Sequence, residues 1–198
     1  MITVWTIQPV ETWERLQTSG RLYTDGRRTP PELRFAYRWM RQQMQSRIPG
    51  YGGRYPWWGW AHPKPDRSAE RSRQSLRRAG HLPRSTRGVR LKLELPDEQA
   101  LPSDFDAWHA VLNRGYLALD EIEFDDFYHR FDAAVPDPHA WPPPEPWHAA
   151  IVSSWERIFD LDRLAADPDW WGPVTYVQVT FECLRLEDVR HVDYFVAR

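Results

Sequence analysis

The chain has 198 residues, of which 41% are apolar and 27% charged, and a formal net charge of −2. This composition is typical of a globular domain with a core of its own. No apolar run approaches the roughly 20 residues of a membrane-spanning helix, and the single cysteine, Cys183, excludes an internal disulfide and a zinc site built from cysteines. The first residues lack the basic and apolar regions of a signal peptide, so we expect a cytoplasmic protein without membrane association.

Charge is unevenly distributed along the chain. Residues 64–92 carry ten lysines and arginines against two acidic residues, whereas residues 94–132 carry eleven acidic residues against two basic ones. Two interpretations are open. The basic part can steer a polyanion onto one face of the protein, or the two parts can neutralise each other in the fold.

The first quarter of the chain is predicted to form one strand and two helices. Residues 2–7 are rich in β-formers, and a helix that begins at Pro9 should end at Gly20. Residues 29–32, Thr-Pro-Pro-Glu, have the pattern of a capping box and predict a second helix that ends near Arg47. The expected apolar face of this helix consists of Phe35, Ala36, Trp39, Met40, Gln43 and Met44.

Five rings crowd the segment from residue 54 to residue 65, where three prolines and one glycine disfavour a helix and predict a loop. The rings belong to Tyr55, Trp57, Trp58, Trp60 and His62. On a loop they can line a pocket and stack on a flat ligand such as a nicotinamide ring, an adenine ring or an unstacked base, which contributes about 1–3 kcal/mol per base. They can equally fill a core.

The middle of the chain alternates between polar and amphipathic segments. Residues 64–87 have almost no apolar side chains and are predicted to be a basic exposed insertion, either a solvated helix or a loop. Strict alternation predicts a strand over residues 89–95. Ser103 is predicted to cap a helix that ends at Gly115, and residues 122–131 should form an acidic amphipathic helix.

The last third is predicted to contain one helix and two strands. Residues 132–146 hold six of the 18 prolines and should form an extended connector. A helix is expected over residues 147–164, followed by strands over residues 174–184 and 191–197. The pattern as a whole predicts a single α+β domain over residues 1–198, with an antiparallel or mixed sheet and several amphipathic helices.

The strand predicted over residues 174–184 has two different faces. One face carries Tyr176, Gln178, Thr180 and Glu182, and the other carries Val177, Val179, Phe181 and Cys183. Because the second face is apolar, the first should meet solvent, a cleft or a ligand. In a cleft, Gln178 or Glu182 would orient the ligand.

Other candidate chemistry is sparse. Asp125 and His129 have the spacing of two metal ligands on a helix, but no second pair completes a site, so we expect no bound metal. The glycines of residues 50–53 lack the lysine of a phosphate-binding loop. Nucleic-acid phosphates can be contacted by the basic residues Arg67, Arg71, Arg77 and Arg78, although no docking motif accompanies them.

Several stretches together resemble a bacterial family known as domain of unknown function 3841. They are residues 4–9 (Val-Trp-Thr-Ile-Gln-Pro) with Trp13, residues 37–44 (Tyr-Arg-Trp-Met-Arg-Gln-Gln-Met), residues 55–58 (Tyr-Pro-Trp-Trp), residues 177–181 (Val-Gln-Val-Thr-Phe) and residues 185–190 (Arg-Leu-Glu-Asp-Val-Arg). The resemblance runs nearly from end to end and implies no particular activity.

A looser resemblance is to the ADP-ribosyltransferase superfamily. In that superfamily a first strand with a residue–Thr pair precedes a helix and a glycine, as Trp5-Thr6 and Gly20 do here. A closing strand there carries a catalytic Glu that orients the nicotinamide ribose, and the resemblance implies this position for Gln178 or Glu182. It also implies NAD as a substrate or ligand. This sequence has Trp5 where those enzymes usually have His or Arg.

Three hypotheses for function remain open. The first is an ADP-ribosyltransferase-like domain that binds a nucleotide, NAD or ADP-ribose, in a cleft between the ring-bearing segment and strand 174–184, with Trp5 and Thr6 at the ligand. The second is a non-catalytic nucleic-acid or base-binding module. The third is a protein-interaction module that uses the proline-rich connector and the acidic helix over residues 120–132.

Overall fold

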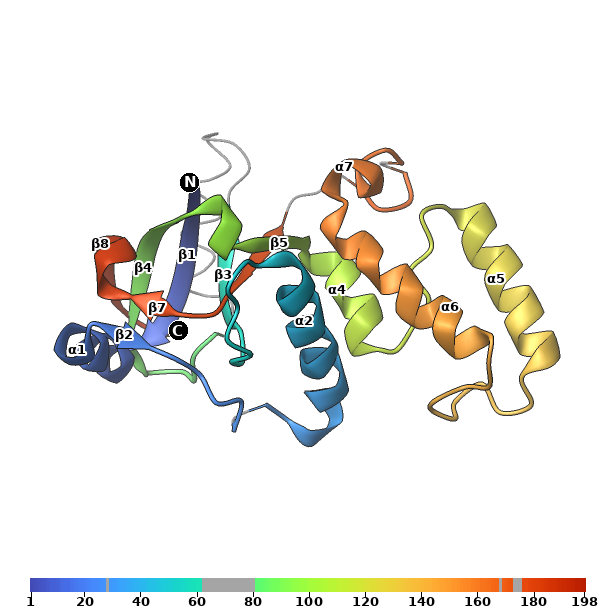
Figure 1. Cartoon of the computed structure of the whole chain (residues 1–198), viewed down its shortest axis with the longest axis horizontal. Helices are drawn as coiled ribbons and strands as arrows, with labels where there is room; N and C mark the ends of the chain where they lie inside the picture. Colours follow the sequence, from blue (N-terminus) through green and yellow to red (C-terminus); the bar gives the residue numbers. More distant parts are fainter. Residues whose placement is uncertain (28, 62–80, 168, 173–175) are drawn as a thin grey trace. The chain divides into compact units, whose positions relative to one another are not determined.

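The computed structural model describes residues 1–27, 29–61, 81–167, 169–172 and 176–198 (Figure 1). The chain is an α+β protein, as predicted, and divides into two compact units. The sheet unit comprises residues 1–102 and 177–198, and the helical unit comprises residues 103–176. Most of the predicted basic insertion, up to residue 80, lies outside the described residues.

A mixed set of strands and helices forms the sheet unit. In chain order it contains β1 (Ile2–Pro9), α1 (Val10–Ser19), β2 (Arg21–Leu22), α2 (Arg34–Arg47), β3 (Trp57–Ala61), β4 (Arg87–Leu95), β6 (Val177–Phe181), β7 (Leu184–Arg185) and β8 (Val189–Val196). Short 3₁₀ helices cover Pro31–Leu33, Asp97–Gln99 and Leu186–Asp188. β5 (Leu101–Asp104) crosses the boundary between the two units.

The main sheet has the strand order β5-β6-β3-β1-β4-β8, and β2 pairs with β7 in a second, two-stranded sheet. β1 pairs antiparallel with both β3 and β4. β3 also pairs antiparallel with β6, and β4 with β8. The last strand of the chain therefore closes one edge of the sheet, as the sequence predicts.

The strand register assigns each side chain to one of two faces of the sheet. The apolar face is formed by Val4, Val89, Leu91, Leu93, Leu95, Val177, Val179 and Phe181, which are all buried. Trp13 of α1 donates its Nε1–H to the Tyr194 hydroxyl of β8 at 2.9 Å, which seats α1 on this face. One part of the core of the sheet unit lies on this face.

Within the ring-bearing segment, residues 57–61 form a strand and not the loop that the prolines predict. β3 covers residues 57–61 and pairs with a strand on each side. Pro56 directly precedes it, where no ladder hydrogen bond is required of it. Aromatic side chains favour strands when their rings pack against neighbouring strands, and this preference outweighs the turn signals around them.

Gly59 is required in the centre of β3, because its Cβ position is already filled. A methyl group there would lie 2.3 Å from Val4 Cγ1 and 3.0 Å from the Trp5 carbonyl oxygen. We therefore expect Gly59→Ala to lower the free energy of unfolding by about 1–3 kcal/mol through overpacking, measured by urea denaturation. Gly115→Ala is the control, since its nearest neighbour would be the Tyr128 hydroxyl at 3.5 Å. Equal stability of the two variants would contradict this assignment.

The two early helices are confirmed, with one correction. α1 ends at Gly20, whose φ of 71° is the left-handed conformation that glycine adopts freely. α2 ends at Arg47, but the capping box predicted at residues 29–32 does not form. Pro30 precedes a 3₁₀ turn without a side-chain cap, and the α-helix begins only at Arg34.

Within the described part of the strand predicted over residues 174–184, β6 covers Val177–Phe181, and all five of its residues are buried. The Thr180 hydroxyl lies 3.8 Å from Met40 Sδ of α2 and 3.4 Å from the Leu101 carbonyl oxygen. Of the three surroundings predicted for the polar face of this strand, solvent is therefore wrong at Thr180, where α2 packs on the strand. Alternation alone cannot tell a face covered by a helix from a face in water.

The helical unit contains α4 (Phe105–Leu112), α5 (Glu121–Ala134), α6 (Trp147–Ser154) and α7 (Leu161–Leu164), with a 3₁₀ helix over Trp155–Phe159. Asp104 caps α4 by accepting from the Ala107 N–H at 2.7 Å, so the prediction of Ser103 as the cap is wrong by one residue. The single helix predicted over residues 147–164 is broken, because Asp160 accepts the Arg163 N–H and starts α7 as a new helix. Residues 135–146 contain no helix or strand.

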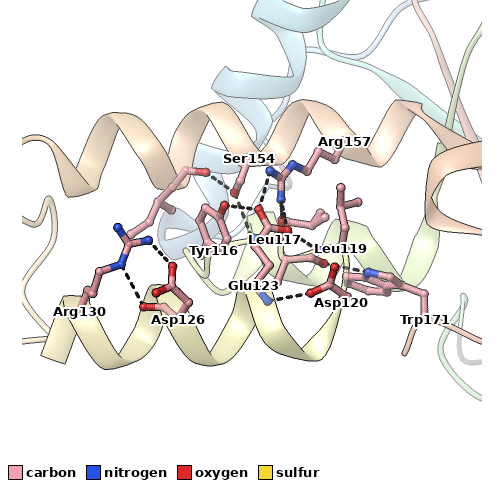
Figure 2. A network of polar contacts seen from close by, with 12 residues as sticks. Tyr116, Leu117, Leu119, Asp120, Glu123, Asp126, Arg130, Ser154, Arg157 and Trp171 are labelled. Carbon is pink, nitrogen blue, oxygen red and sulfur yellow. Dashed lines mark hydrogen bonds and ion pairs between the residues drawn. The ribbon is translucent and has the colours of Figure 1, made fainter. Parts of the chain in front are cut away.

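A polar network links α5 to the 3₁₀ helix that follows α6 (Figure 2). Arg157 donates from Nη1 and Nη2 to the two oxygens of Glu123, at 2.9 and 2.8 Å. Glu123 also accepts hydrogen bonds from the Tyr116 hydroxyl at 2.6 Å and from the Leu119 N–H at 2.8 Å.

No helix among the described residues is long and apolar enough to cross a membrane.

Candidate binding pocket of the sheet unit

A pocket of about 110 Å³ lies in the sheet unit, where α2 ends and β6 leads into β7. It is lined by Ile48, Pro49, Gly50, Tyr51, Leu95, Gln99, Phe181, Glu182, Cys183 and Arg185. Four of these side chains carry hydrogen-bonding groups of different kinds: a carboxylate, a guanidinium, an amide and a phenol. Glu182, a residue predicted to orient a ligand, is therefore part of this pocket, which we take as the candidate site.

The loop after α2 shapes one wall of the pocket. α2 stops at Arg47, and the Ile48 N–H closes the last turn onto the Met44 carbonyl oxygen at 2.8 Å. Gly50 and Gly53 follow with φ values of 73° and 80°, which other residues adopt only with strain. The two glycines let the chain reverse tightly and turn backbone N–H groups toward Glu182.

Glu182 is held by backbone donors of this loop. Its Oε1 accepts the Gly52 N–H at 2.9 Å and the Arg54 N–H at 3.1 Å, while Oε2 shares the Gly52 N–H at 3.0 Å. Such charge-assisted hydrogen bonds orient a carboxylate strongly. Because each carboxylate oxygen can accept two hydrogen bonds, Oε2 keeps an acceptor site for a ligand hydroxyl group.

Arg185 supplies the positive charge of the pocket. Its Nη1 donates to the Gln99 side-chain oxygen and lies 3.9 Å from Asp188 Oδ2. Burial raises the pKa of Asp188, although the charge of Arg185 acts against this rise. The guanidinium thus contacts Gln99 and Asp188, and 34% of the Arg185 side chain remains exposed.

Tyr51, on the loop after α2, lines the pocket together with Glu182. Burial raises the pKa of its hydroxyl, and the charge of Glu182 acts in the same direction, while Arg41 lowers it. The hydroxyl is therefore protonated at neutral pH and donates to the Arg54 carbonyl oxygen. Together the pocket offers a fixed acceptor at Glu182 and a fixed cation at Arg185, which suits a ligand with hydroxyl groups and an anionic group.

Of the residues predicted at the site, four lie on the polar face of the sheet and outside the pocket. Trp60 of β3 lies opposite both Trp5 of β1 and Gln178 of β6, and Trp58 follows on the same face. The Gln178 side-chain oxygen is buried and accepts no hydrogen bond from the described residues. Gln178 and Glu182 are therefore separated, and only Glu182 lines the pocket.

The tryptophans of the polar face have partners within the protein. The Arg90 guanidinium lies 4.8 Å from the centre of the Trp5 ring. Trp58 packs edge-on against Tyr37 of α2 at 5.9 Å, and Trp60 packs against His81 at 5.8 Å.

The remaining predicted residues lie elsewhere. The Thr6 hydroxyl donates to the Trp58 carbonyl oxygen, and Trp57 Nε1 donates to the Leu22 carbonyl oxygen, so both point to the apolar face. Tyr55 stacks under Arg41 at 4.8 Å. His62, Arg67, Arg71, Arg77 and Arg78 lie outside the described residues.

Sequence reasoning did not single out Arg185, Gln99 or Tyr51. They come from three separate elements, and no spacing along the chain connects them. The glycines of residues 50–53 do not match a phosphate-binding loop, and in the structure they shape the wall around a carboxylate. Among residues that the structure describes, no group of three or more His, Cys, Asp or Glu side chains is placed to hold a metal ion.

The fold and the pocket define an α+β domain with a small polar pocket at one end of a largely antiparallel sheet. The family model described as domain of unknown function 3841 matches residues 3–189. The chain belongs to this family. Neither the curated proteins nor the solved structures gave a match.

Proposed function

We propose that this domain binds a nucleotide of the NAD or ADP-ribose type through the pocket around Glu182. The observation that supports this most directly is the convergence of Glu182 and Arg185, side chains of opposite charge, on one pocket. A ribose presents hydroxyl donors and a phosphate presents an anion, so one nucleotide can engage both groups at once.

The size of the pocket limits which part of the ligand enters. Pockets that enclose a drug-sized ligand have volumes of about 300–1,000 Å³, and this one has about 110 Å³. It therefore accepts a terminal ribose or a phosphate while the rest of the nucleotide lies outside. The backbone hydrogen bonds to Glu182 lower the cost of ordering the site on binding.

The binding test uses the full chain and four ligands: NAD, ADP-ribose, ATP and a short single-stranded oligonucleotide. Intrinsic tryptophan fluorescence and melting temperature both report binding, since the chain has twelve tryptophans. We expect saturable binding of NAD or ADP-ribose, with the dissociation constant raised at least tenfold in Arg185→Met. That loss equals about 1.4 kcal/mol, which is modest for a hydrogen bond to a charged group.

The matched control is Arg190→Met. Arg190 is exposed, lies five residues further along the same segment and does not line the pocket, so the change in net charge is the same. If both variants weakened binding equally, the loss of affinity in Arg185→Met would come from the change in net charge and not from a contact in the pocket. No saturable binding of any of the nucleotides at millimolar concentration would overturn the proposal.

The enzymatic version of this proposal gives Glu182 a further role. Its carboxylate would stabilise the oxocarbenium-like ribose as nicotinamide leaves NAD. Glu182→Gln keeps the shape and one carbonyl acceptor for the loop N–H groups, so it should abolish nicotinamide release while the melting temperature changes by only a few degrees. Glu187→Gln, at an exposed position nearby, should keep full activity. Undiminished release in Glu182→Gln would exclude Glu182.

A further inference from the structure

A second surface of the sheet unit is rich in arginine. Residues 21–58 contain eight arginines and no lysine, against two acidic residues, Asp25 and Glu32. Asp25 pairs with Arg27 at 3.0 Å. α2 lies within this stretch and carries four arginines and no acidic residue. The excess of positive charge is therefore concentrated on one helix and the segments beside it.

Three of these arginines form one stripe along α2. Arg34, Arg38 and Arg41 are spaced by four and three residues, which places them on one side of the helix. Arg34 and Arg38 are exposed, and neither has an ion pair within the described part of the chain. At 1.5 Å per residue the stripe extends about 10 Å, which is longer than a single phosphate requires.

Aromatic rings extend the stripe at its Arg41 end. The Arg41 guanidinium lies over the Tyr55 ring, at 4.8 Å from its centre, and donates to the Gly53 carbonyl oxygen at 2.5 Å. The neighbouring Arg54 lies over the ring of Tyr23, at 5.4 Å. Tyr23 is 46% exposed. Arginines that are stacked on rings keep their planar outer faces available for phosphates and bases.

We propose that this arginine surface, formed by Arg34, Arg38, Arg41, Arg54 and Tyr23, binds single-stranded nucleic acid. The exposed cations Arg34 and Arg38 can follow a phosphate backbone, and an exposed ring flanked by a guanidinium stacks an unpaired base. None of the residues of this surface lines the Glu182 pocket, although the surface adjoins it through the Arg54 N–H, which bonds to Glu182. None of its residues belongs to the basic insertion predicted over residues 64–87.

The test measures binding of a fluorescently labelled single-stranded 12-nucleotide RNA to the full chain, by anisotropy, between 50 and 200 mM KCl. Each phosphate contact to a single strand contributes about 0.7 to the salt slope. The double variant Arg34→Gln/Arg38→Gln should therefore lower the slope by about 1.4 and weaken binding about 25-fold at 0.1 M salt. Tyr23→Leu should weaken binding at every salt concentration without changing the slope.

The matched control is Arg15→Gln/Arg87→Gln, which removes the same charge from two exposed positions of the sheet unit outside the surface. It should bind RNA nearly as tightly as the unchanged chain. The inference is overturned if no RNA binds, if the two double variants lose affinity equally, or if heparin binds as tightly as RNA and Tyr23→Leu has no effect. Because nucleotide binding is read from Arg185→Met, failure here leaves the pocket proposal standing, and the reverse also holds.

Discussion

Trp155→Ala is expected to destabilise the helical unit by about 3–5 kcal/mol. Trp155 is only 2% exposed and is the largest of the fully buried side chains. Its Nε1–H donates to the Gly115 carbonyl oxygen at 2.7 Å, and its ring stacks on Trp141 at 5.9 Å. Alanine would leave a cavity and an unpaired carbonyl group together. Urea unfolding of the full chain, followed by circular dichroism at 222 nm, measures the loss.

Two further variants separate these contributions. Trp155→Phe removes the hydrogen bond but keeps most of the ring, so it should cost less than the alanine variant. Trp170→Ala is the control, since that ring is only partly buried and contacts Phe124 at 5.5 Å without packing in the core. If Trp155→Ala cost no more than Trp170→Ala, the buried tryptophan would not be the centre of this core.

The second large effect is expected at Arg157, in the polar network of Figure 2. Arg157→Met would remove both bonds to Glu123 and a third to the Leu117 carbonyl oxygen at 2.6 Å. Breaking one side of a fully buried pair costs about 3–5 kcal/mol. The side chains of Arg157 and Glu123 are 22% and 29% exposed, so we expect about 2–3 kcal/mol after allowance for water.

The neighbouring pair on α5 is the control. Asp126 and Arg130 are about 60% exposed and four residues apart, so Arg130→Met should cost at most about 0.5 kcal/mol. A double-mutant cycle with Glu123→Gln then isolates the pairing of Arg157 with Glu123. A coupling energy near zero would show that the pair does not hold α5 in place.

The same pair makes stability depend on pH. Partial burial acts to raise the pKa of Glu123, but hydrogen bonds from Arg157, Tyr116 and the Leu119 N–H outweigh it and lower the pKa below the ordinary 4.5. The folded state therefore binds the proton more weakly than the unfolded state. This contribution is complete above pH 4.5 and is lost as the pH falls further. The difference between Arg157→Met and the unchanged chain should accordingly shrink from pH 5 to pH 3.

Periodicity along the chain predicts best the elements that have one buried face and one exposed face. α1 and α2 follow from their apolar spacing and from stops such as Gly20, because one face meets the core and the other meets water. β4 follows from its strict alternation, although its second face is also largely covered. β3 and β6 are surrounded by protein on more sides. Their sequences look like a loop and a half-exposed strand, because the helix and strands that cover them are distant in sequence.

The candidate site was predictable only in part. Glu182 was predictable because it belongs to a polar row on a strand whose other face is apolar, and it does line the pocket. Its backbone donors at Gly52 and Arg54 could not be foreseen, since the loop that supplies them is 130 residues away. The arginines of α2 are visible in the sequence, but the basic run over residues 64–92 is denser and gives the stronger prediction of phosphate contacts.

The helical unit begins and ends at neighbouring points. The chain leaves the sheet unit after residue 102 and returns at residue 177, and the Phe105 N–H bonds to the Tyr176 carbonyl oxygen at 2.9 Å. A flexible segment of this length would make it harder for β6 to find β3, since each doubling of a loop adds about 0.6 kcal/mol of closure entropy. A helical unit that folds first presents its two ends together and removes most of that cost. During synthesis a folded helical unit would then hold its two ends close together. The last strands would emerge beside the part of the sheet that was made first.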